Sequence, residues 1–400
     1  MKQETISWRF VENAYPSREA LEKILNSDKK LKIYLGVDPT GPHLHLGHAT
    51  NLLLLRQLQN LGHKIIFLIG DFTGRIGDPT DKLAARQPLT ERQIKENLKT
   101  FKSQAAKIIR FSGKNPATVA FNSKWHKNMT FERLIELAHY FTVQQMIERD
   151  MFQKRLKEEK PIGLHEFFYP LMQGYDSVAL NVDMEIGGND QTFNMLAGRT
   201  LLKIYKNKEK FVITTKLLVN PETGKKIMNK SEGGLINLDD DPQNMFGKVM
   251  ALDDRTMFIL ASLSTLMPDI DITKMRSEVE KGTLNPKDAK LKIAHAVVSL
   301  YHSPTASDKA EAGWVKTFSK RELPDEIEVQ AIPSDILASS GTTAMLVAIG
   351  AAKSNSEARR LISQGAVKVG GRAVSDPNEK RKDGEIIKVG KHRFFKLKKK

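Results

Sequence analysis

Hydrophobic and polar positions in the first two hundred residues alternate between two patterns. Short apolar runs at 31–37 and 63–70 are typical of buried strands, and the amphipathic stretch 46–61 between them is typical of a helix. The same alternation predicts helices at 90–109, 131–159, 165–180 and 189–205, with strands at 117–121 and 183–186. Strands that alternate with helices predict an α/β fold, a Rossmann-like parallel sheet with helices on both faces.

The pattern changes after about residue 220. Helical periodicity at 242–266 and 287–301 comes with little strand signal, and a polar, weakly periodic stretch follows it. A small mixed unit of helices and short, glycine-separated strands then runs to the end of the chain. We therefore predict a Rossmann-like domain at 1–220, a helical domain at 221–325, a linker at 326–340 and a small α+β domain at 341–400.

Composition is that of an ordinary globular protein, with 40% hydrophobic and 28% charged residues. No apolar run is as long as a bilayer-spanning helix, and residues 1–10 lack the apolar stretch of a secretory signal, so we expect no membrane association. The chain has no cysteine, which excludes disulfides and thiolate zinc sites and fits a reducing cytoplasm.

The charge of the chain points to a polyanionic partner. The formal net charge is +16, and residues 341–400 alone hold 15 Lys and Arg against 5 Asp and Glu. A basic segment of this kind attracts nucleic acid, and the alternative is that it only keeps the protein soluble.

The strongest local motif is the segment 34–48, which reads YLGVDPTGPHLHLGH. A strand ends in a Gly/Pro-rich loop, and a helix then begins with His45 and His48 on one face. Gly47 between them lets a planar ligand lie against the backbone. Imidazoles beside free N–H groups at a helix N-terminus can bind a phosphate whose charge grows during a reaction, and the alternative is that they are packing residues.

A lysine loop is the second motif, in the segment 224–234, which reads GKKIMNKSEGG. Lysines on a mobile loop can supply positive charge to an anionic leaving group and close over it. Without the histidine motif before it, the same segment would be typical of a solvated basic turn.

A polar face on the predicted helix 165–180 is the third feature. Tyr169, Gln173 and Asp176 are spaced i, i+4 and i+7 on an otherwise apolar helix, so they share a face that needs polar partners. Asp78 follows the second strand, and the alternative is that it is only a turn residue. Gly188 and Asp190 follow the strand at 183–186, where glycine permits close backbone approach to a nucleoside and the carboxylate can accept hydrogen bonds from ribose.

The segment 34–48 resembles the signature of class I aminoacyl-tRNA synthetases. Taken together, the segments resemble the tyrosyl-tRNA synthetases over nearly the whole chain. The stretch GGNDQTFN at 187–194 lacks the Trp-Gly of the best-known bacterial members and is similar to a second bacterial subgroup. In the lysine loop, Asn229 replaces the family's first serine and Ile227 stands where its first lysine would fall, so Lys230 matches better than Lys226.

The resemblance implies a role for each motif. His45 and His48 would stabilise the α-phosphate of ATP during attack by the amino-acid carboxylate, and Lys226 and Lys230 would assist. The tyrosine site would consist of Tyr34 and Asp176 at the phenol and Asp78, Tyr169 and Gln173 at the ammonium group, with Gln191 nearby. The ATP site would consist of Gly36, Asp38, Thr40, His45, Gly47, His48, Gly188, Asp190, Met228 and Lys230.

The carboxyl-terminal unit resembles a small ribosomal-protein-type RNA-binding domain, with a helix–turn–strand pattern at 354–371. The side chains expected to face phosphates are Lys353, Arg359, Arg360, Lys368 and Arg372, and such contacts position RNA without reading its sequence.

As a whole, the resemblance implies the activation of tyrosine with ATP and the loading of tRNA(Tyr). It also implies Mg²⁺ as part of the ATP substrate complex, no protein-bound metal or prosthetic group, a cytoplasmic location, and a homodimer built on helices inserted in the catalytic domain. Two alternatives remain at this point. A tryptophanyl-tRNA synthetase shares the motifs but normally lacks the basic tail, and a non-catalytic RNA-binding relative would explain the altered lysine loop.

Overall fold

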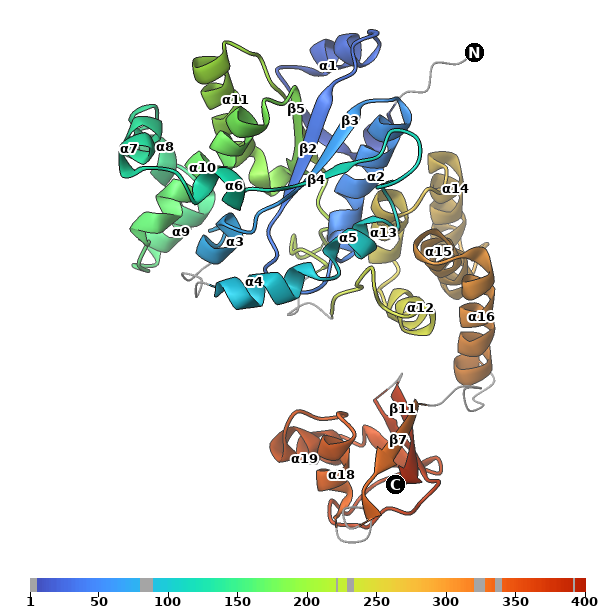
Figure 1. Cartoon of the computed structure of the whole chain (residues 1–400). Coiled ribbons are helices and arrows are strands. Elements are labelled where there is room, and N and C mark those ends of the chain that lie inside the picture. Colours follow the sequence, from blue (N-terminus) through green and yellow to red (C-terminus); the bar gives the residue numbers. More distant parts are fainter. Residues whose placement is uncertain are drawn as a thin grey trace. The chain divides into compact units, whose positions relative to one another are not determined.

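The structure, a computed structural model, describes residues 6–79, 89–220, 222–228, 234–319, 328–334, 340–390 and 393–400. The chain folds into two compact units, Met1–Asp308 and Lys309–Lys400 (Figure 1). Within the described ranges, no helix is both long and apolar enough to cross a membrane.

A six-stranded sheet forms the centre of the first unit. Its strands, in spatial order, are β1 (Val11–Tyr15), β6 (Phe211–Thr215), β5 (Met184–Gly188), β2 (Lys32–Val37), β3 (Lys64–Ile69) and β4 (Thr118–Phe121). All neighbours are parallel except β1, which runs antiparallel to β6. The chain winds outward from β2 in both directions, so β2 and β5 flank a topological switch point. Ligands bind at such points, outside the carboxyl ends of the strands.

The central strands are apolar because both faces of the sheet are covered. Every residue of β3 from Ile65 to Ile69 is buried, and β2 is buried at four of its six positions. Tyr34 in β2 lies opposite Ile66 of β3 and Glu185 of β5. The predicted parallel sheet is thus confirmed, and it holds one tyrosine and one glutamate in its interior.

Two long helices, α10 (Leu164–Leu180) and α11 (Thr192–Lys206), pack closely on each other. Glycines permit this approach, since a Cβ on Gly174 would lie 3.2 Å from the carbonyl carbon of Ala197 and a Cβ on Gly198 would lie 3.4 Å from the Cα of Gly174. Each helix ends at an asparagine in the left-handed conformation, Asn181 and Asn207.

The other helical elements of the sheet region are shorter, apart from α2. They are η1 (Trp8–Phe10), α1 (Arg18–Leu25), α2 (Leu46–Asn60), α3 (Thr73–Ile76), α4 (Glu91–Leu98), α5 (Phe101–Ala105), α6 (Ser123–His126) and η2 (Asn189–Gln191). The single helix predicted at 90–109 is wrong, because the chain turns between α4 and α5 and again after Ala105.

The single helix predicted at 131–159 is also wrong. The structure has three short helices there, α7 (Phe131–His139), α8 (Val143–Ile147) and α9 (Asp150–Lys157). Thr142 is the physical reason for the first break, because its side chain accepts a hydrogen bond from the Gln145 N–H and starts a new helix. Apolar periodicity continues across this cap, which is why the pattern alone suggested one helix.

Helices follow the sheet along the chain, as the helical periodicity after residue 220 predicted. They are α12 (Pro242–Met250), α13 (Thr256–Ser264), α14 (Asp269–Glu280), α15 (Pro286–Tyr301) and α16 (Pro304–Trp314), followed by a π-helical turn at Val315–Ser319. Figure 1 shows α13 beside α2, and the hydroxyl of Thr50 in α2 donates to the carbonyl oxygen of Leu263 in α13 at 3.0 Å.

The second unit is a small α+β domain around an apolar core. Its helices are α18 (Thr342–Ala348) and α19 (Asn355–Ser363), and its strands are β7 (Glu328–Ile332), β8 (Val367–Val369), β9 (Arg372–Ala373), β10 (Ile386–Val389) and β11 (Arg393–Lys399). The five strands form one sheet in the order β7-β11-β10-β8-β9.

The predicted linker at 326–340 is corrected in part by this sheet. Strand β7 lies within that range and pairs in parallel with β11, and Ile332 is buried in the core of the domain. Strand β7 is only five residues long and is stabilised by pairing with a strand more than sixty positions later, so the local sequence carries little strand signal.

Candidate active site

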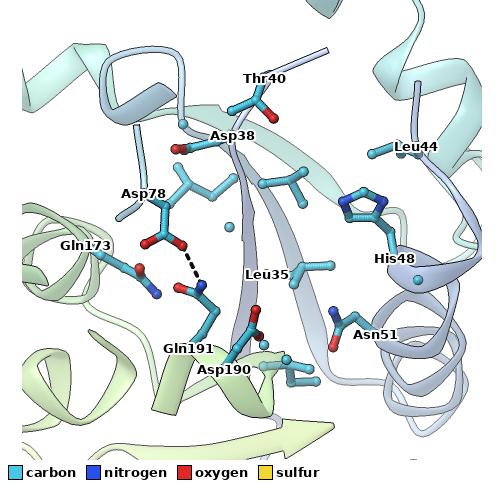
Figure 2. A pocket seen from close by; sticks show the side chains of 18 of the residues that line it. Leu35, Asp38, Thr40, Leu44, His48, Asn51, Asp78, Gln173, Asp190 and Gln191 are labelled. Atoms are coloured by element: carbon cyan, nitrogen blue, oxygen red, sulfur yellow. Dashed lines mark hydrogen bonds between the residues drawn. The ribbon is translucent and has the colours of Figure 1, made fainter. Parts of the chain in front are cut away.

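A cavity of about 410 Å³ opens at the carboxyl ends of β2 and β5. Figure 2 shows Asp78, Gln173 and Gln191 on one side of it, facing His48 and Asn51 on the other. Every described residue of the predicted tyrosine, ATP and catalytic sets lines this one cavity: Tyr34, Gly36, Asp38, Thr40, His45, Gly47, His48, Asp78, Tyr169, Gln173, Asp176, Gly188, Asp190, Gln191, Lys226 and Met228. Lys230 lies outside the described residues.

Two stacked histidines begin helix α2 at one wall of the cavity. His45 caps the helix, with its Nδ1 accepting from the Gly47 N–H at 3.1 Å, and Nδ1 of His48 accepts from the His45 N–H at 3.1 Å. Their ring centroids are 4.0 Å apart. A Cβ on Gly47 would lie 2.8 Å from the His45 ring, so this approach requires glycine.

Both imidazoles are neutral near pH 7. Burial lowers the pKa of His45 to about 2, with the nearby His48 and the Lys226 ammonium adding to the shift. Burial also lowers the pKa of His48 to about 4. A neutral ring whose Nδ1 accepts a hydrogen bond carries its proton on Nε2. Each histidine therefore offers an Nε2–H donor, which suits an anionic ligand without adding a positive charge.

Asp176 lies at the inner end of the cavity and is 3% exposed. Its Oδ1 accepts from Nε1 of Trp125 at 2.7 Å and lies 2.7 Å from Nε2 of His126, and its Oδ2 accepts from Nδ2 of Asn122 at 3.3 Å. Burial raises the pKa of Asp176, and the hydrogen bonds from His126, Trp125 and Asn122 oppose that shift. A carboxylate has about four lone-pair positions, so these contacts leave room for one further donor from a ligand.

The polar groups nearer the cavity mouth form two hydrogen-bonded sets. Asp38 accepts from the hydroxyl of Tyr169 at 2.8 Å and from the hydroxyl of Thr73 at 2.7 Å. Burial raises the pKa of Asp38 to about 7, although these two hydrogen bonds lower it. In the second set, Nε2 of Gln191 donates to Oδ2 of Asp78 at 2.6 Å, the contact drawn in Figure 2.

Asp190, the residue that the sequence assigns to the ribose of ATP, forms an ion pair in the structure. Nζ of Lys226 lies 2.6 Å from Oδ2 of Asp190, and both side chains are partly exposed to the cavity. Gly188 lies two residues before Asp190. A side chain at this position would fill the space beside the strand end, because its Cβ would lie 3.0 Å from the Leu217 side chain. The glycine thus leaves the strand end open to a flat ligand.

Several lining residues were not predicted. They are Asn51, Thr73, Asn122 and Glu185, together with apolar residues of β2, β3 and α2. Asn122 directly follows β4, so the rule that polar residues after parallel strands face the site would have found it. Glu185 lies inside a buried strand, where a carboxylate gives no sequence signal of its partner. Among the described residues, no group of three or more His, Asp or Glu is arranged to hold a metal ion.

The five residues predicted to contact RNA lie in the second unit, and all of them are exposed. Arg359 and Arg360 are on α19, Lys353 precedes that helix, and Lys368 and Arg372 are on the neighbouring strands β8 and β9. The structure thus leaves these cations open to solvent around one helix and one hairpin.

Comparisons with known proteins agree with these two units. Residues 26–319 match the family model described as tRNA synthetases class I (W and Y), and residues 344–387 match that of the S4 domain. A tyrosine–tRNA ligase of Carboxydothermus hydrogenoformans is 44% identical to the chain, with 97% of this chain and 96% of the relative covered. A tyrosine–tRNA ligase of Aquifex aeolicus is 42% identical, with 95% and 94% covered.

Solved structures show the same fold. A C-terminally truncated mitochondrial tyrosyl-tRNA synthetase of Aspergillus nidulans superposes with a TM-score of 0.64 at 22% identity, covering 77% of this chain and 91% of that one. The family match spans most of the chain, and the curated relatives match over nearly their whole length. The chain therefore belongs to the class I tRNA synthetases and, within that family, to the tyrosine–tRNA ligases.

Proposed function

We propose that the cavity between β2 and β5 is where this tyrosine–tRNA ligase joins tyrosine to ATP. One observation carries the proposal: the described residues of three separate sequence motifs line a single cavity at the switch point of the sheet. The reaction gives tyrosyl-adenylate and pyrophosphate, and the tyrosyl group then passes to the 3′ end of tRNA(Tyr). No covalent intermediate on a side chain is needed, so positioning and electrostatics supply the rate.

Tyrosine is proposed to bind with its phenol toward Asp176 and Tyr34. Both are buried, and Asp176 keeps a lone pair for the phenolic proton after its contacts with Trp125, His126 and Asn122. A buried carboxylate that awaits a hydroxyl rejects phenylalanine, which would leave it without that donor.

The ammonium group of tyrosine is proposed to lie among Asp78, Tyr169 and Gln173. Support comes from their position together on the cavity wall, with Gln191 bonded to Asp78. Carboxylate, phenol and amide oxygens can all accept from an ammonium group. The amino acid would then lie along the wall from Asp176 to Asp78.

The Mg²⁺ complex of ATP is proposed to lie over Gly36, Asp38 and Thr40. Gly188 would contact the nucleoside, Asp190 the ribose, and the Nε2–H groups of His45 and His48 the α-phosphate. Lys226, Met228 and Lys230 would lie along the pyrophosphate. Preorganised neutral donors at a point of developing negative charge stabilise a transition state without reorganisation.

The second unit is proposed to hold tRNA(Tyr) through Lys353, Arg359, Arg360, Lys368 and Arg372. Their exposure in an S4-type domain supports this role. Contacts of this type go to phosphates and weaken steeply with salt. The helical region, α12 to α16, is proposed as the part that approaches the anticodon, and the cytoplasm as the place of the reaction.

A homodimer is proposed through the helices inserted between β4 and β5. Six of the ten large apolar side chains that are most exposed among the described residues lie between 131 and 164: Phe131, Ile135, Tyr140, Val143, Leu156 and Leu164. Apolar side chains gathered in this way on one surface region mark protein–protein contacts. A second copy of the chain is the partner to which we assign this surface.

ATP–pyrophosphate exchange tests the proposal. We expect exchange with tyrosine, and far slower exchange with tryptophan or phenylalanine at equal concentrations. Exchange that depends on tryptophan would reassign the amino acid within the same family. No exchange with any of the three, from protein that binds tRNA(Tyr), would instead indicate a binding protein that has lost catalysis.

A further inference from the structure

A buried polar cluster lies directly behind the tyrosine end of the cavity. Lys210, the residue before β6, is 1% exposed, Glu185 is 1% exposed, and Ser177 is fully buried. Nζ of Lys210 donates to Glu185 and, at 2.8 Å, to Oγ of Ser177. Glu185 lines the cavity, whereas Lys210 and Ser177 belong to the layer behind it. None of the motifs recognised in the sequence includes Lys210.

Space for this cluster comes from a glycine on α11. A Cβ on Gly198 would lie 2.5 Å from Nζ of Lys210 and 2.7 Å from Oγ of Ser177. Any larger residue there would displace the lysine from its partners. The close crossing of α10 and α11 thus serves a polar contact as well as packing.

Glu185 links the lysine to the ammonium end of the cavity. Its Oε1 accepts from Nε2 of Gln173 at 3.1 Å, while its Oε2 faces Lys210. An amide has its donor and acceptor on different atoms, so a bond to the NH₂ group fixes which way the side chain is turned. Glu185 therefore leaves the carbonyl oxygen of Gln173 as the group available to an ammonium ion.

Ser177 links the same lysine to the phenol end. Its Oγ lies 2.9 Å from the hydroxyl oxygen of Tyr34, and either atom could be the donor in isolation. The ammonium group of Lys210, paired with the Glu185 carboxylate, has only N–H donors and therefore donates to Ser177. With one lone pair of Ser177 taken by Lys210, the serine proton is directed to Tyr34. The Tyr34 proton can then turn to Glu185 or to a ligand in the cavity, and both lie on its open side.

We propose that Lys210 is a positioning residue that sets the polar groups at both ends of the bound tyrosine, through Glu185 at one end and Ser177 at the other. This inference rests on the proposed roles of Gln173 and Tyr34. The substrate phenol would then donate to Asp176 and accept from Tyr34, a pattern that phenylalanine cannot satisfy. Losing the lysine would loosen both contacts and leave Glu185 buried without its cation.

The test compares kcat/KM for tyrosine and phenylalanine in ATP–pyrophosphate exchange with Lys210→Met. Their ratio does not depend on the fraction of active protein, so partial misfolding does not affect it. We expect the ratio to fall about tenfold, the effect of losing a hydrogen bond to a charged group. KM for ATP should stay at the wild-type value. Lys210→Gln, which keeps an N–H₂ group, should recover part of the lost ratio.

Two further variants separate positioning from stability. Ser177→Ala removes only the branch toward Tyr34 and should lower the ratio without a large loss of volume. Arg155→Met breaks a different buried ion pair, with Glu166, away from the cavity. It should lower the unfolding temperature and leave the ratio unchanged.

Three outcomes would overturn the inference. One is a wild-type ratio in both Lys210→Met and Ser177→Ala. Another is an equal fall of the ratio in Arg155→Met, which would make the effect one of general stability. The third is a rise in KM for ATP as large as that for tyrosine. Failure of the wild-type chain to catalyse tyrosine-dependent exchange would count against the proposed function itself, and so is distinguishable from all three.

Discussion

The Nζ atom of Lys226 lies 2.6 Å from the Oδ2 atom of Asp190, joining the lysine loop to the end of strand β5. The next residue, Ile227, is 6% exposed, and its N–H donates to the Leu218 carbonyl at 2.8 Å. The backbone therefore turns the lysine toward the cavity and the isoleucine into the core. This explains why an apolar residue stands where the family pattern suggests a lysine, with the lysine one position earlier.

Lys226 should contribute to catalysis, since ATP bound with its ribose at Asp190 would release the lysine toward the phosphates. We expect Lys226→Met to lower kcat for ATP–pyrophosphate exchange by about tenfold or more, because a preorganised cation is lost. Lys225 is exposed and provides the matched control. Lys225→Met should stay within about twofold of the wild type, as surface substitutions usually do. Equal effects of the two substitutions would rule out the register described here.

Much of the fold and of the site could be predicted from local pattern. Central strands are apolar because both faces are covered, and polar residues after them face the switch point, which places Asp38, Asp78 and Asp190 at one edge of the sheet. The same logic extends to Asn122, which directly follows the strand predicted at 117–121 but was not among the predicted site residues. Site residues at strand ends can thus be predicted from sequence, because a parallel sheet brings the carboxyl ends of its strands together.

Pairings between distant residues could not be predicted in this way. Glu185 is in β5 and Lys210 immediately precedes β6. They meet because β5 and β6 pair in parallel, and a single sequence does not contain that register. The break at Thr142 and the strand at β7 have a similar cause. The side-chain cap of Thr142 causes the helix break, and pairing with the distant strand β11 stabilises β7. Apolar periodicity contains no signal of either.

His48 should act through its Nε2–H group and not through a positive charge. His48→Ala should reduce adenylate formation by more than about tenfold with little change in tyrosine affinity, as expected for a contact made only in the transition state. His48→Gln can place an amide N–H near the Nε2 position and should retain more activity than the alanine variant. Single-turnover adenylate formation and tyrosine binding measure the two quantities, and near-normal exchange in His48→Ala would contradict the assignment.

Asp38 should make the stability of the unliganded protein depend on pH. Burial raises its pKa to about 7 from an ordinary value of 3.8. A carboxyl with a raised pKa binds its proton more tightly in the folded chain, so its contribution is complete below about pH 4 and is lost as the pH rises through about 7. Between these limits the wild type should lose on the order of 4 kcal/mol of unfolding free energy relative to Asp38→Asn.

Urea unfolding of both proteins at several pH values measures that difference. Asp38→Asn removes the titrating group and keeps an oxygen for the Thr73 hydroxyl. Its amide nitrogen replaces the oxygen that accepts from Tyr169, a loss that does not depend on pH. Its unfolding free energy should therefore vary less with pH over this window than that of the wild type. Parallel pH profiles for the two proteins would show that Asp38 does not titrate there.

The apolar surface on the inserted helices should hold two copies of the chain together. Ile135 on α7 is 55% exposed, and a charge there would be buried without a partner in a dimer. We expect Ile135→Glu to shift the protein to monomer at micromolar concentration in sedimentation equilibrium. Ile270 on α14 is 74% exposed, so Ile270→Glu is the matched control and should leave the mass unchanged. An Ile135→Glu variant that remains dimeric would place the contact elsewhere. A wild-type chain that is already monomeric would contradict the proposed dimer.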